Sequence, residues 1–370
     1  TTVFNKEVID YNLLKDIVSR WSSSKKKMVL VGVHAPNRIS QKWLNSLAND
    51  DSILVFTETT SNMNHPNFFP SIDKIISPLT SEEMEMLRPD ILLTFGGLIV
   101  SKKIKAFLRK FQPKHHWHID ELKANNTFFC LEHHIKISPN EFFDAIFQQS
   151  ISPIISNYKP MWNAVKRHRS EKHDSFLRSV PFSDLKVFDI IINELPQGII
   201  LQLSNSATVR YAQLFDMDRS VEVFCNRGTS GIDGSTSTAI GCAVVGKKQT
   251  FLVTGDLSFF YDSNALWNNY IPNNFRIILI NNSGGGIFRI LPGKNDTDIF
   301  ETFFETKHNL SAKQLCEMFN IVYATAKTSN ELREAMSRLK DDNNAPILLE
   351  IFTPSTINDQ VLLDYFEFIA

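Results

Sequence analysis

Residues 250–282 read TFLVTGDLSFFYDSNALWNNYIPNNFRIILINN, and this stretch decides the fold. Its two apolar runs, 250–254 and 276–280, are short and rich in branched residues, as expected of strands in a parallel sheet covered on both faces. Between them, residues 263–270 are predicted to form a helix, so the stretch reads as one strand–helix–strand unit. The crossover in such a unit is right-handed, and its two strands lie parallel in one sheet.

A polar pair follows each of these strands. Asp256, in the pair GD, follows the first, and Asn282, in the pair NN, follows the second 26 positions later. Both side chains are therefore predicted at the carboxyl edge of one sheet, where ligands bind in open α/β folds. A carboxylate, an amide oxygen and a backbone carbonyl of Ser283 or Gly284 are hard ligands, which Mg²⁺ combines with phosphate oxygens and water. Either pair alone is common turn chemistry, but both at this spacing predict a site for magnesium and phosphate.

Helix and strand patterns alternate along the whole chain, which predicts an α/β fold with two doubly wound, mostly parallel-sheet domains. The first domain is predicted at 1–155 and the second at 184–370. Residues 156–183 are polar and rich in basic side chains, so they are interpreted as a helical connector or an exposed linker. The strands expected in the two domains are 28–33, 53–58, 91–95 and 116–119, and then 198–203, 250–254, 276–280 and 347–352.

Composition and charge argue against two classes of partner. Of the 370 residues, 39 are Lys or Arg and 40 are Asp or Glu, so no basic excess predicts a nucleic acid partner. No apolar run reaches the roughly 18 residues that a membrane span needs. The cysteines are Cys130, Cys225, Cys242 and Cys316. Their spacing fits neither a CxxC pair nor a zinc site, so they are interpreted as buried thiols of a cytoplasmic protein. The histidines at 115–118 and 133–134 lack the ligand spacing of a metal site and are predicted to be structural.

Four segments together resemble one family. They are SNSATVR at 204–210, NRGTSGIDG at 226–234, GDLSFFYDSNAL at 255–266 and NNSGGGIFRILP at 281–292. In this order they resemble the MenD family, the 2-succinyl-5-enolpyruvyl-6-hydroxy-3-cyclohexene-1-carboxylate synthases, within the superfamily of pyruvate decarboxylase and acetolactate synthase. The resemblance is strongest over 198–295. It implies that the second domain binds thiamine diphosphate with Mg²⁺ and that the first is the central domain.

The resemblance also implies roles for single residues. The implied metal ligands are Asp256, Asn282 and the carbonyl of Gly284. The other implied cofactor-binding residues are Ser204, Asn205, Gly231, Ile232, Gly255, Leu257, Ser258, Gly285, Ile287 and Phe288. Ile232 matches the residue that props the cofactor into a bent shape, a task that suits a stiff β-branched side chain. The residues implied in catalysis are Ser206, Arg210, Arg227 and Ile232, and those implied in substrate contact are Lys102, Lys103, Ser206, Arg210, Arg227, Phe288 and Leu291.

The reaction implied by the family joins two dicarboxylates in menaquinone biosynthesis. The enzyme decarboxylates 2-oxoglutarate on thiamine diphosphate and adds the resulting succinyl-semialdehyde carbanion to isochorismate. Arginine suits both substrates, because guanidinium groups bind carboxylates bidentately and stay charged. Lys102 and Lys103 would bring positive charge to the acceptor, although a surface pair at a helix start explains them equally well. A homodimer or homotetramer through the cofactor domain is expected.

One part of the family's active site has no counterpart in the two domains. The family carries a glutamate that hydrogen-bonds the pyrimidine ring, on a domain that precedes the central one. We therefore expect that the chain is a truncated form without the pyrimidine-binding domain, with little or no synthase activity alone. Two alternatives are another thiamine-diphosphate enzyme, of the 2-oxoacid decarboxylase or acetolactate synthase type, and a non-catalytic cofactor-binding fragment.

Overall fold

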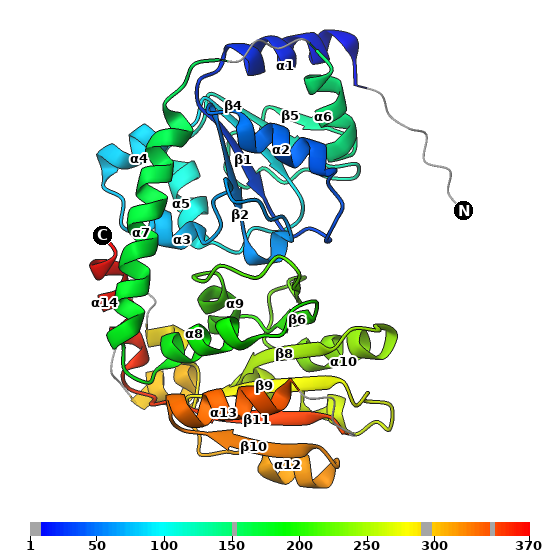
Figure 1. Cartoon of the computed structure of the whole chain (residues 1–370), viewed down its shortest axis with the longest axis vertical. Coiled ribbons are helices and arrows are strands. Elements are labelled where there is room, and N and C mark those ends of the chain that lie inside the picture. The colour runs from blue at the N-terminus through cyan, green and yellow to red at the C-terminus, as the bar shows by residue number, and fades with distance from the viewer. Residues whose placement is uncertain (1–8, 150–153, 290–297, 341–344) are drawn as a thin grey trace. The chain divides into compact units, whose positions relative to one another are not determined.

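The computed structural model describes residues 9–149, 154–289, 298–340 and 345–370 (Figure 1). The described chain divides into two compact units: unit 1 runs to Lys172 and includes 369–370, and unit 2 is His173–Phe368. Each unit is built on one all-parallel sheet with helices, so the predicted α/β fold class is confirmed. The domain boundaries at 155 and 183 stay predictions. No described helix is long and apolar enough to cross a membrane.

Unit 1 contains a five-stranded sheet in the order β2-β1-β3-β4-β5. The strands are β1 (Lys27–Val31), β2 (Ile53–Thr57), β3 (Ile91–Phe95), β4 (His115–Ile119) and β5 (His133–Ile135). The helices are α1 (Tyr11–Ser23), α2 (Gln41–Asn49), α3 (Ile72–Ile76), α4 (Ser81–Leu87), α5 (Lys102–Lys110) and α6 (Pro139–Phe147). Every residue of β1, β2 and β3 is buried, as expected of central strands covered on both faces.

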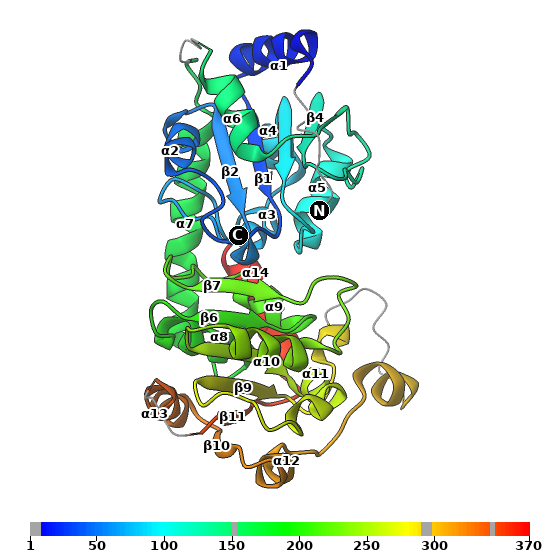
Figure 2. The same cartoon turned by 90° about the vertical axis from the view of Figure 1, so that its right-hand side faces the viewer.

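Unit 2 contains a six-stranded sheet in the order β10-β11-β9-β8-β6-β7, and Figure 2 shows β7 and β10 at its opposite edges. The strands are β6 (Ile200–Leu203), β7 (Glu222–Cys225), β8 (Thr250–Gly255), β9 (Phe275–Asn281), β10 (Val322–Ala326) and β11 (Ile347–Phe352). The helices are α8 (Asp184–Glu194), α9 (Ala207–Ala212), α10 (Ser235–Val245), α11 (Asp256–Tyr261), α12 (Lys313–Met318), α13 (Ser329–Leu339) and α14 (Asn358–Phe368). Strands β8 and β9 pair in parallel, with Gly255 opposite Ile280, so both end at the same edge.

One prediction about helices was wrong in detail, and another, which left a helical connector or an exposed linker open, is decided in favour of the helix. The crossover helix was predicted at 263–270, but α11 begins at Asp256, and Ser263–Leu266 forms only a 3-10 turn. The chain passes straight from strand to helix because Gly255 serves as the N-cap and Oδ1 of Asp256 accepts the N–H of Leu257 at 2.7 Å. The polar stretch read as a connector forms one 22-residue helix, α7 (Tyr158–Ser179). It is not an exposed linker, because its Trp162, Arg169 and His173 side chains are buried.

Candidate cofactor and metal site

The loops that follow β8 and β9 meet at the carboxyl edge of the unit 2 sheet. The backbone N–H of Gly284 donates to Oδ2 of Asp256 at 3.0 Å. This bond joins the GD motif to the loop that begins with Asn282. The structure therefore brings together the three residues that the sequence pattern proposed as metal ligands, as the strand–helix–strand spacing requires.

Asp256 is the first residue of α11 and is 3% exposed. Its carboxylate accepts the N–H groups of Leu257 and Gly284, which leaves lone pairs on both oxygens for a cation. His308 lies beside it, with Nε2 at 3.3 Å from Oδ2 of Asp256. That nitrogen is buried and makes no hydrogen bond within the described residues. An unsatisfied buried nitrogen next to a carboxylate is the kind of group that a bound ligand or its water would satisfy.

Asn282 is held in one orientation by a buried carboxylate. Its Nδ2 donates to Oδ2 of Asp184 at 2.8 Å, and Thr353 Oγ1 donates to Oδ1 of the same carboxylate at 2.6 Å. Burial raises the pKa of Asp184 to about 6, the carboxylate of Asp256 adds to the rise, and the hydrogen bonds from Thr353 and Asn282 oppose it. Because the amide nitrogen of Asn282 is used in this way, its oxygen is the end left for a cation. Sequence reasoning missed both Asp184 and His308, and no local motif marks either.

The loop after Asn282 follows a path that only glycine allows. Gly284 has a φ of +148°, and a Cβ at this position would lie 2.6 Å from the carbonyl oxygen of Glu305. The next residue, Gly285, donates its N–H to that same oxygen at 2.6 Å. The backbone of His308 completes the contact by donating to the carbonyl of Ser283 at 3.2 Å. The absence of a Cβ therefore lets the loop pack against the backbone of Glu305 while the N–H of Gly284 reaches the carboxylate of Asp256.

The loop after β6 carries Ser204, Asn205 and Ser206. Nδ2 of Asn205 donates to the carbonyls of Asn226 and Gly231 at 2.6 and 2.7 Å, and its Oδ1 accepts from Arg227 at 2.8 Å. In this structure the Asn205 amide therefore ties together the loops after β6 and β7, and its role toward a cofactor stays a prediction. Ser204 Oγ donates to Thr208 Oγ1 at 3.0 Å, and Ser206 has a φ of +65° where α9 begins.

The segment with Gly231 and Ile232 lies against α11. Ser258 Oγ donates to the carbonyl of Ile232 at 2.5 Å. This bond anchors the backbone of Ile232 to α11, and the side chain of Ile232 is half-buried. Arg227 is half-buried, and its Nε makes no hydrogen bond among the described residues. A guanidinium held by Asn205 at one nitrogen and unsatisfied at another suits a carboxylate ligand. Arg210 is half-buried on α9.

The remaining predicted residues are placed less closely or not at all. The ring of Phe288 meets the ring of Phe304 edge-on, with centroids 5.9 Å apart. Of Ile287 only the backbone is described, in a 3-10 turn, and Leu291 lies outside the described residues. Lys102 and Lys103 are exposed at the start of α5 in unit 1. Of the cysteines, all four are unpaired, but only Cys316 is buried, so the prediction of four buried thiols was wrong for the other three.

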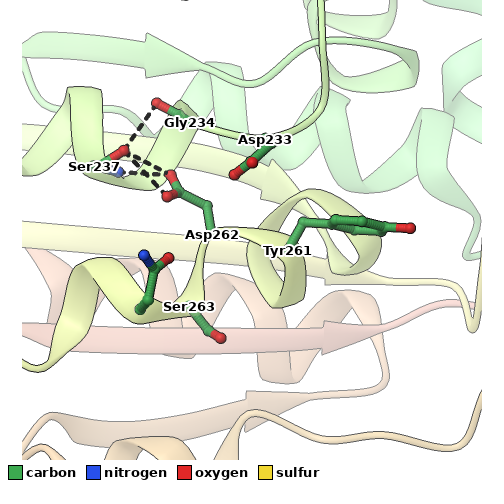
Figure 3. A pocket seen from close by; sticks show the side chains of 7 residues that line it. Asp233, Gly234, Ser237, Tyr261, Asp262 and Ser263 are labelled. Atoms are coloured by element: carbon green, nitrogen blue, oxygen red, sulfur yellow. Dashed lines mark hydrogen bonds between the residues drawn. The ribbon is translucent and has the colours of Figure 1, made fainter.

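A pocket of about 510 Å³ lies at the start of α10 (Figure 3). The carboxylate of Asp262 is turned toward Ser237 there and accepts its backbone N–H at 2.7 Å and its hydroxyl at 3.0 Å. Asp262 thus occupies the helix N-terminus, and Asp233 adds a second carboxylate to the lining. A diphosphate is not expected in this pocket, because the two carboxylates repel an anion and Asp262 already accepts the N–H of Ser237 at the helix N-terminus.

The donor set at the carboxyl edge fits Mg²⁺ in the presence of a diphosphate. Asp256, Asn282 and Gly284 offer one carboxylate, one amide oxygen and one carbonyl oxygen. Mg²⁺ typically takes one or two carboxylates from the protein and fills its octahedron with phosphate oxygens and water. Within the described ranges no group of three or more His, Cys, Asp or Glu side chains could hold a metal, so a site of the zinc type is not found there.

Comparison with known proteins decides the family. Residues 206–351 match the model described as "Thiamine pyrophosphate enzyme, C-terminal TPP binding domain". The chain is 50% identical to the 2-succinyl-5-enolpyruvyl-6-hydroxy-3-cyclohexene-1-carboxylate synthase of Flavobacterium psychrophilum, over 99% of this chain and 68% of that protein. The chain belongs to this family.

Two further relatives with the same name come from Christiangramia forsetii, at 50% identity over 96% of this chain, and Porphyromonas gingivalis, at 34% identity over 96%. The chain spans 62% and 63% of the length of these two synthases. The matches confirm the predicted family, and with the domain match they support thiamine diphosphate as its cofactor.

Proposed function

We propose that this chain supplies the metal- and diphosphate-binding part of a synthase that decarboxylates 2-oxoglutarate and adds the four-carbon product to isochorismate. The observation that carries the proposal is the meeting of Asp256, Asn282 and Gly284 at one sheet edge, in a chain that is 50% identical to relatives bearing the synthase name. When bound, thiamine diphosphate supplies the electron sink for loss of carbon dioxide. The protein contributes binding, orientation and charge.

In this proposal the metal site is held by two layers of residues. Asp256, Asn282 and the Gly284 carbonyl would bind Mg²⁺, which in turn would hold the diphosphate oxygens. Asp184 fixes the amide of Asn282 through a 2.8 Å bond, and such outer hydrogen bonds orient ligands before the metal arrives. Ser204, Asn205, Gly255, Leu257, Ser258 and Gly285 are proposed around the cofactor.

The substrate side of the site would be formed by cationic and apolar groups. Arg210 and Arg227 would bind the substrate carboxylates, with Ser206 beside them, because a guanidinium can meet a carboxylate with two parallel hydrogen bonds. Ile232 would support the bent cofactor, and its carbonyl is already anchored by Ser258. Phe288, Ile287 and Leu291 are proposed for the apolar wall, and Lys102 and Lys103 for the acceptor.

The metal assignment can be tested on the 370-residue chain. Thiamine diphosphate is titrated with and without Mg²⁺ by calorimetry, using the wild type, Asp256→Asn and Asp218→Asn. Asp218 is exposed and lies before the amino end of β7, whereas Asp256 lies at the carboxyl ends of the strands, so Asp218→Asn controls for the loss of a carboxylate elsewhere. Asp256→Asn should weaken Mg²⁺-dependent binding about 10-fold or more, which is the effect expected from the loss of one charge-assisted contact. Asp218→Asn should leave this binding unchanged. Equal binding by wild type and Asp256→Asn would refute the metal assignment.

The reaction is tested by a donor screen. A protein that also contains the glutamate-bearing domain should turn over 2-oxoglutarate in preference to pyruvate. Preference for pyruvate would instead favour the decarboxylase or acetolactate synthase alternative. Binding without turnover in every form of the protein would favour a non-catalytic cofactor-binding fragment. Turnover by the 370-residue chain alone, at the level of a complete synthase, would contradict the expected truncation.

Two further features are proposed on indirect support. The four unpaired cysteines suit the reducing cytoplasm, which is the location we propose. A homodimer or homotetramer through unit 2 is proposed from the family, and sedimentation of the chain with and without cofactor would measure it.

A further inference from the structure

Unit 1 contains a pocket that the proposed reaction does not use. It has a volume of about 190 Å³ and lies at the carboxyl ends of β3 and β4. Its polar side consists of Thr94, His116 and His118, and its other walls include Lys105, Ile99 and Phe128. The two histidines belong to the HHWH segment, which the sequence alone gave no reason to connect with a ligand.

The polar side is a hydrogen-bonded trio on two neighbouring strands. Thr94 pairs with His118 across β3 and β4, and His116 lies two positions earlier on the same face. Thr94 Oγ1 lies 2.9 Å from Nε2 of His116 and 2.8 Å from Nδ1 of His118. His116 is 1% exposed, and its Nδ1 has no hydrogen-bond partner among the described residues.

This trio interrupts an otherwise apolar face. Leu92 on β3 and Ile104 and Phe107 on α5 belong to the hydrophobic cluster of this side of the sheet. A buried imidazole with an unsatisfied nitrogen is costly in such surroundings, and each such group in a folded protein requires an explanation. Burial also lowers the pKa of His116 to about 4, so the ring is neutral near pH 7 and can accept or donate one hydrogen bond. The trio therefore places neutral hydrogen-bonding groups, rather than charge, on this side of the pocket.

A nucleotide or a free phosphate does not suit this pocket. In open α/β sheets phosphates bind at a helix N-terminus, but α5 is already capped by Ser101, whose Oγ accepts the N–H of Ile104 at 3.1 Å, and a carboxylate lies just before the helix. The buried carboxylate of Glu58 accepts the N–H of Val100 and of Ser101, each at 2.7 Å. The crevice between β1 and β3, where the strand order reverses, is also closed, because the backbones of Gly32 and Gly97 touch there. The volume is below that of pockets for drug-sized ligands.

The charges around the pocket favour a small anion with an apolar part. Lys105 and Lys123 line it, and Nζ of Lys105 donates to the carbonyl of Ile99 at 3.1 Å. The one carboxylate in the lining, Asp120, is engaged in its own turn, where Oδ1 accepts the N–H of Leu122 and of Lys123 at 2.8 and 2.9 Å. The lining also includes the ring of Phe128, which is buried and stands edge-on to His116, with centroids 5.5 Å apart.

We propose that this pocket binds a small monocarboxylate, with its carboxylate at Lys105 and its apolar part against Phe128. The polar trio lines the pocket beside these two residues, so a bound ligand changes the surroundings of both histidines. The proposal rests on the geometry of unit 1 alone and does not depend on the reaction proposed for unit 2.

The test uses the histidine side chains as reporters. The 370-residue chain, labelled with ¹⁵N-histidine, is titrated with sodium butyrate and, separately, with sodium benzoate, inorganic phosphate and AMP at constant ionic strength and pH. Butyrate or benzoate should shift the imidazole signals of His116 and His118 in a saturable way, with no comparable shift for His65, which lies outside the pocket lining. Stronger saturable binding of phosphate or AMP would overturn the carboxylate assignment, and no saturable shift with either carboxylate would overturn the site.

Two matched variants locate the binding charge. Lys105→Met should raise the dissociation constant about 10-fold or more, as expected for loss of a charge-assisted hydrogen bond. Lys110→Met, which removes an exposed charge at the end of the same helix, should change it less than about 2-fold. Lys123→Met, on an exposed loop that tolerates substitution, provides a second variant and should also weaken binding. Equal effects of Lys105→Met and Lys110→Met would refute the proposal, because binding would then follow net charge only.

Discussion

Replacing Gly284 by alanine tests the account of the loop at the candidate metal site. The added Cβ would lie 2.6 Å from the carbonyl oxygen of Glu305, and the residue has a φ of +148°. The clashing oxygen is a backbone atom that accepts the N–H of Gly285, so it cannot rotate away as a flexible side chain would. The loop must therefore move or the residue must leave its backbone conformation.

The cost can be worked from these two contributions. A non-glycine residue in such a region of φ costs about 1–3 kcal/mol. An overpacked contact adds about 1–3 kcal/mol. Gly284→Ala should therefore lower the free energy of unfolding of unit 2 by roughly 2–6 kcal/mol, the sum of the two ranges. Gly241→Ala is the matched control, because Gly241 is inside α10 with open space at its Cβ. It should stabilise the unit by about 0.5–1 kcal/mol through helix propensity.

The two units require separate probes, since a chain with two units need not unfold in one step. Hydrogen exchange followed by mass spectrometry at a series of urea concentrations reports on the peptides that cover β8 and β9 separately from those that cover β1 and β3. Gly284→Ala should shift the transition of β8 and β9 to lower urea and leave β1 and β3 unchanged. Identical transitions in Gly284→Ala and wild type, or equal destabilisation by Gly241→Ala, would show that the loop is not held as the structure indicates.

Three further predictions follow from single residues. The pKa of His116 is lowered by burial to about 4 from 6.5, so above pH 6.5 its contribution to stability is complete, and it is lost as the pH falls through 6.5 to 4. The full loss amounts to about 3 kcal/mol, of which about 2.5 kcal/mol falls between pH 7 and pH 4.5. His116→Gln should remove this part from urea-denaturation free energies measured over that pH range, and an unchanged pH profile would count against the assignment. Glu350→Gln should lower the free energy of unfolding, measured by urea denaturation, by about 2–4 kcal/mol. The buried carboxylate accepts hydrogen bonds from Ala312, Ser311 and Tyr323, and the amide N–H₂ of glutamine would face one of these donors. Glu317→Gln, at an exposed position, should leave the free energy of unfolding unchanged. In a synthase with all its domains, Lys102→Met with Lys103→Met should raise KM for isochorismate about 10-fold with kcat unchanged, and Lys110→Met should not; equal KM values would remove the pair from the site.

The strands that are buried along their whole length could be predicted, because each appears in the sequence as a continuous apolar run. Strands β8 and β9 are almost entirely buried, and their apolar runs identified them directly. Strands β7 and β10 lie at the two edges of the sheet and were missed. In β10 only Ala326 is buried, so its residues Val322–Ala326 show neither an apolar run nor a clean alternation. Edge strands are defined by the neighbour that they pair with, and this is information that a local pattern does not contain.

The sequence predicted which proposed metal ligands lie together, but not the residues that hold those ligands in place. Asp256 and Asn282 stand at strand ends one crossover apart, which places them together by topology alone. The residue that holds Asn282, Asp184, precedes it by 98 positions and reaches it only through the packing of α8. For Asn205, the family resemblance implies a cofactor contact, which stays a prediction, but the sequence did not indicate that its amide also bridges two loops. The spacing of residues along strands predicts proximity, but it does not predict which partner a polar group will choose.

The two units use one architecture and differ at the carboxyl edge because of a few glycines and carboxylates. In unit 1, Gly32 and Gly97 bring two backbones into contact, and Glu58 occupies the start of α5, so the usual anion site is filled by the chain itself. In unit 2, Gly284 lets the loop after β9 pass close to the backbone of Glu305, and its N–H donates to the carboxylate of Asp256 at 3.0 Å. The groups that each parallel sheet presents at its carboxyl edge therefore follow from the strand-end residues rather than from the fold.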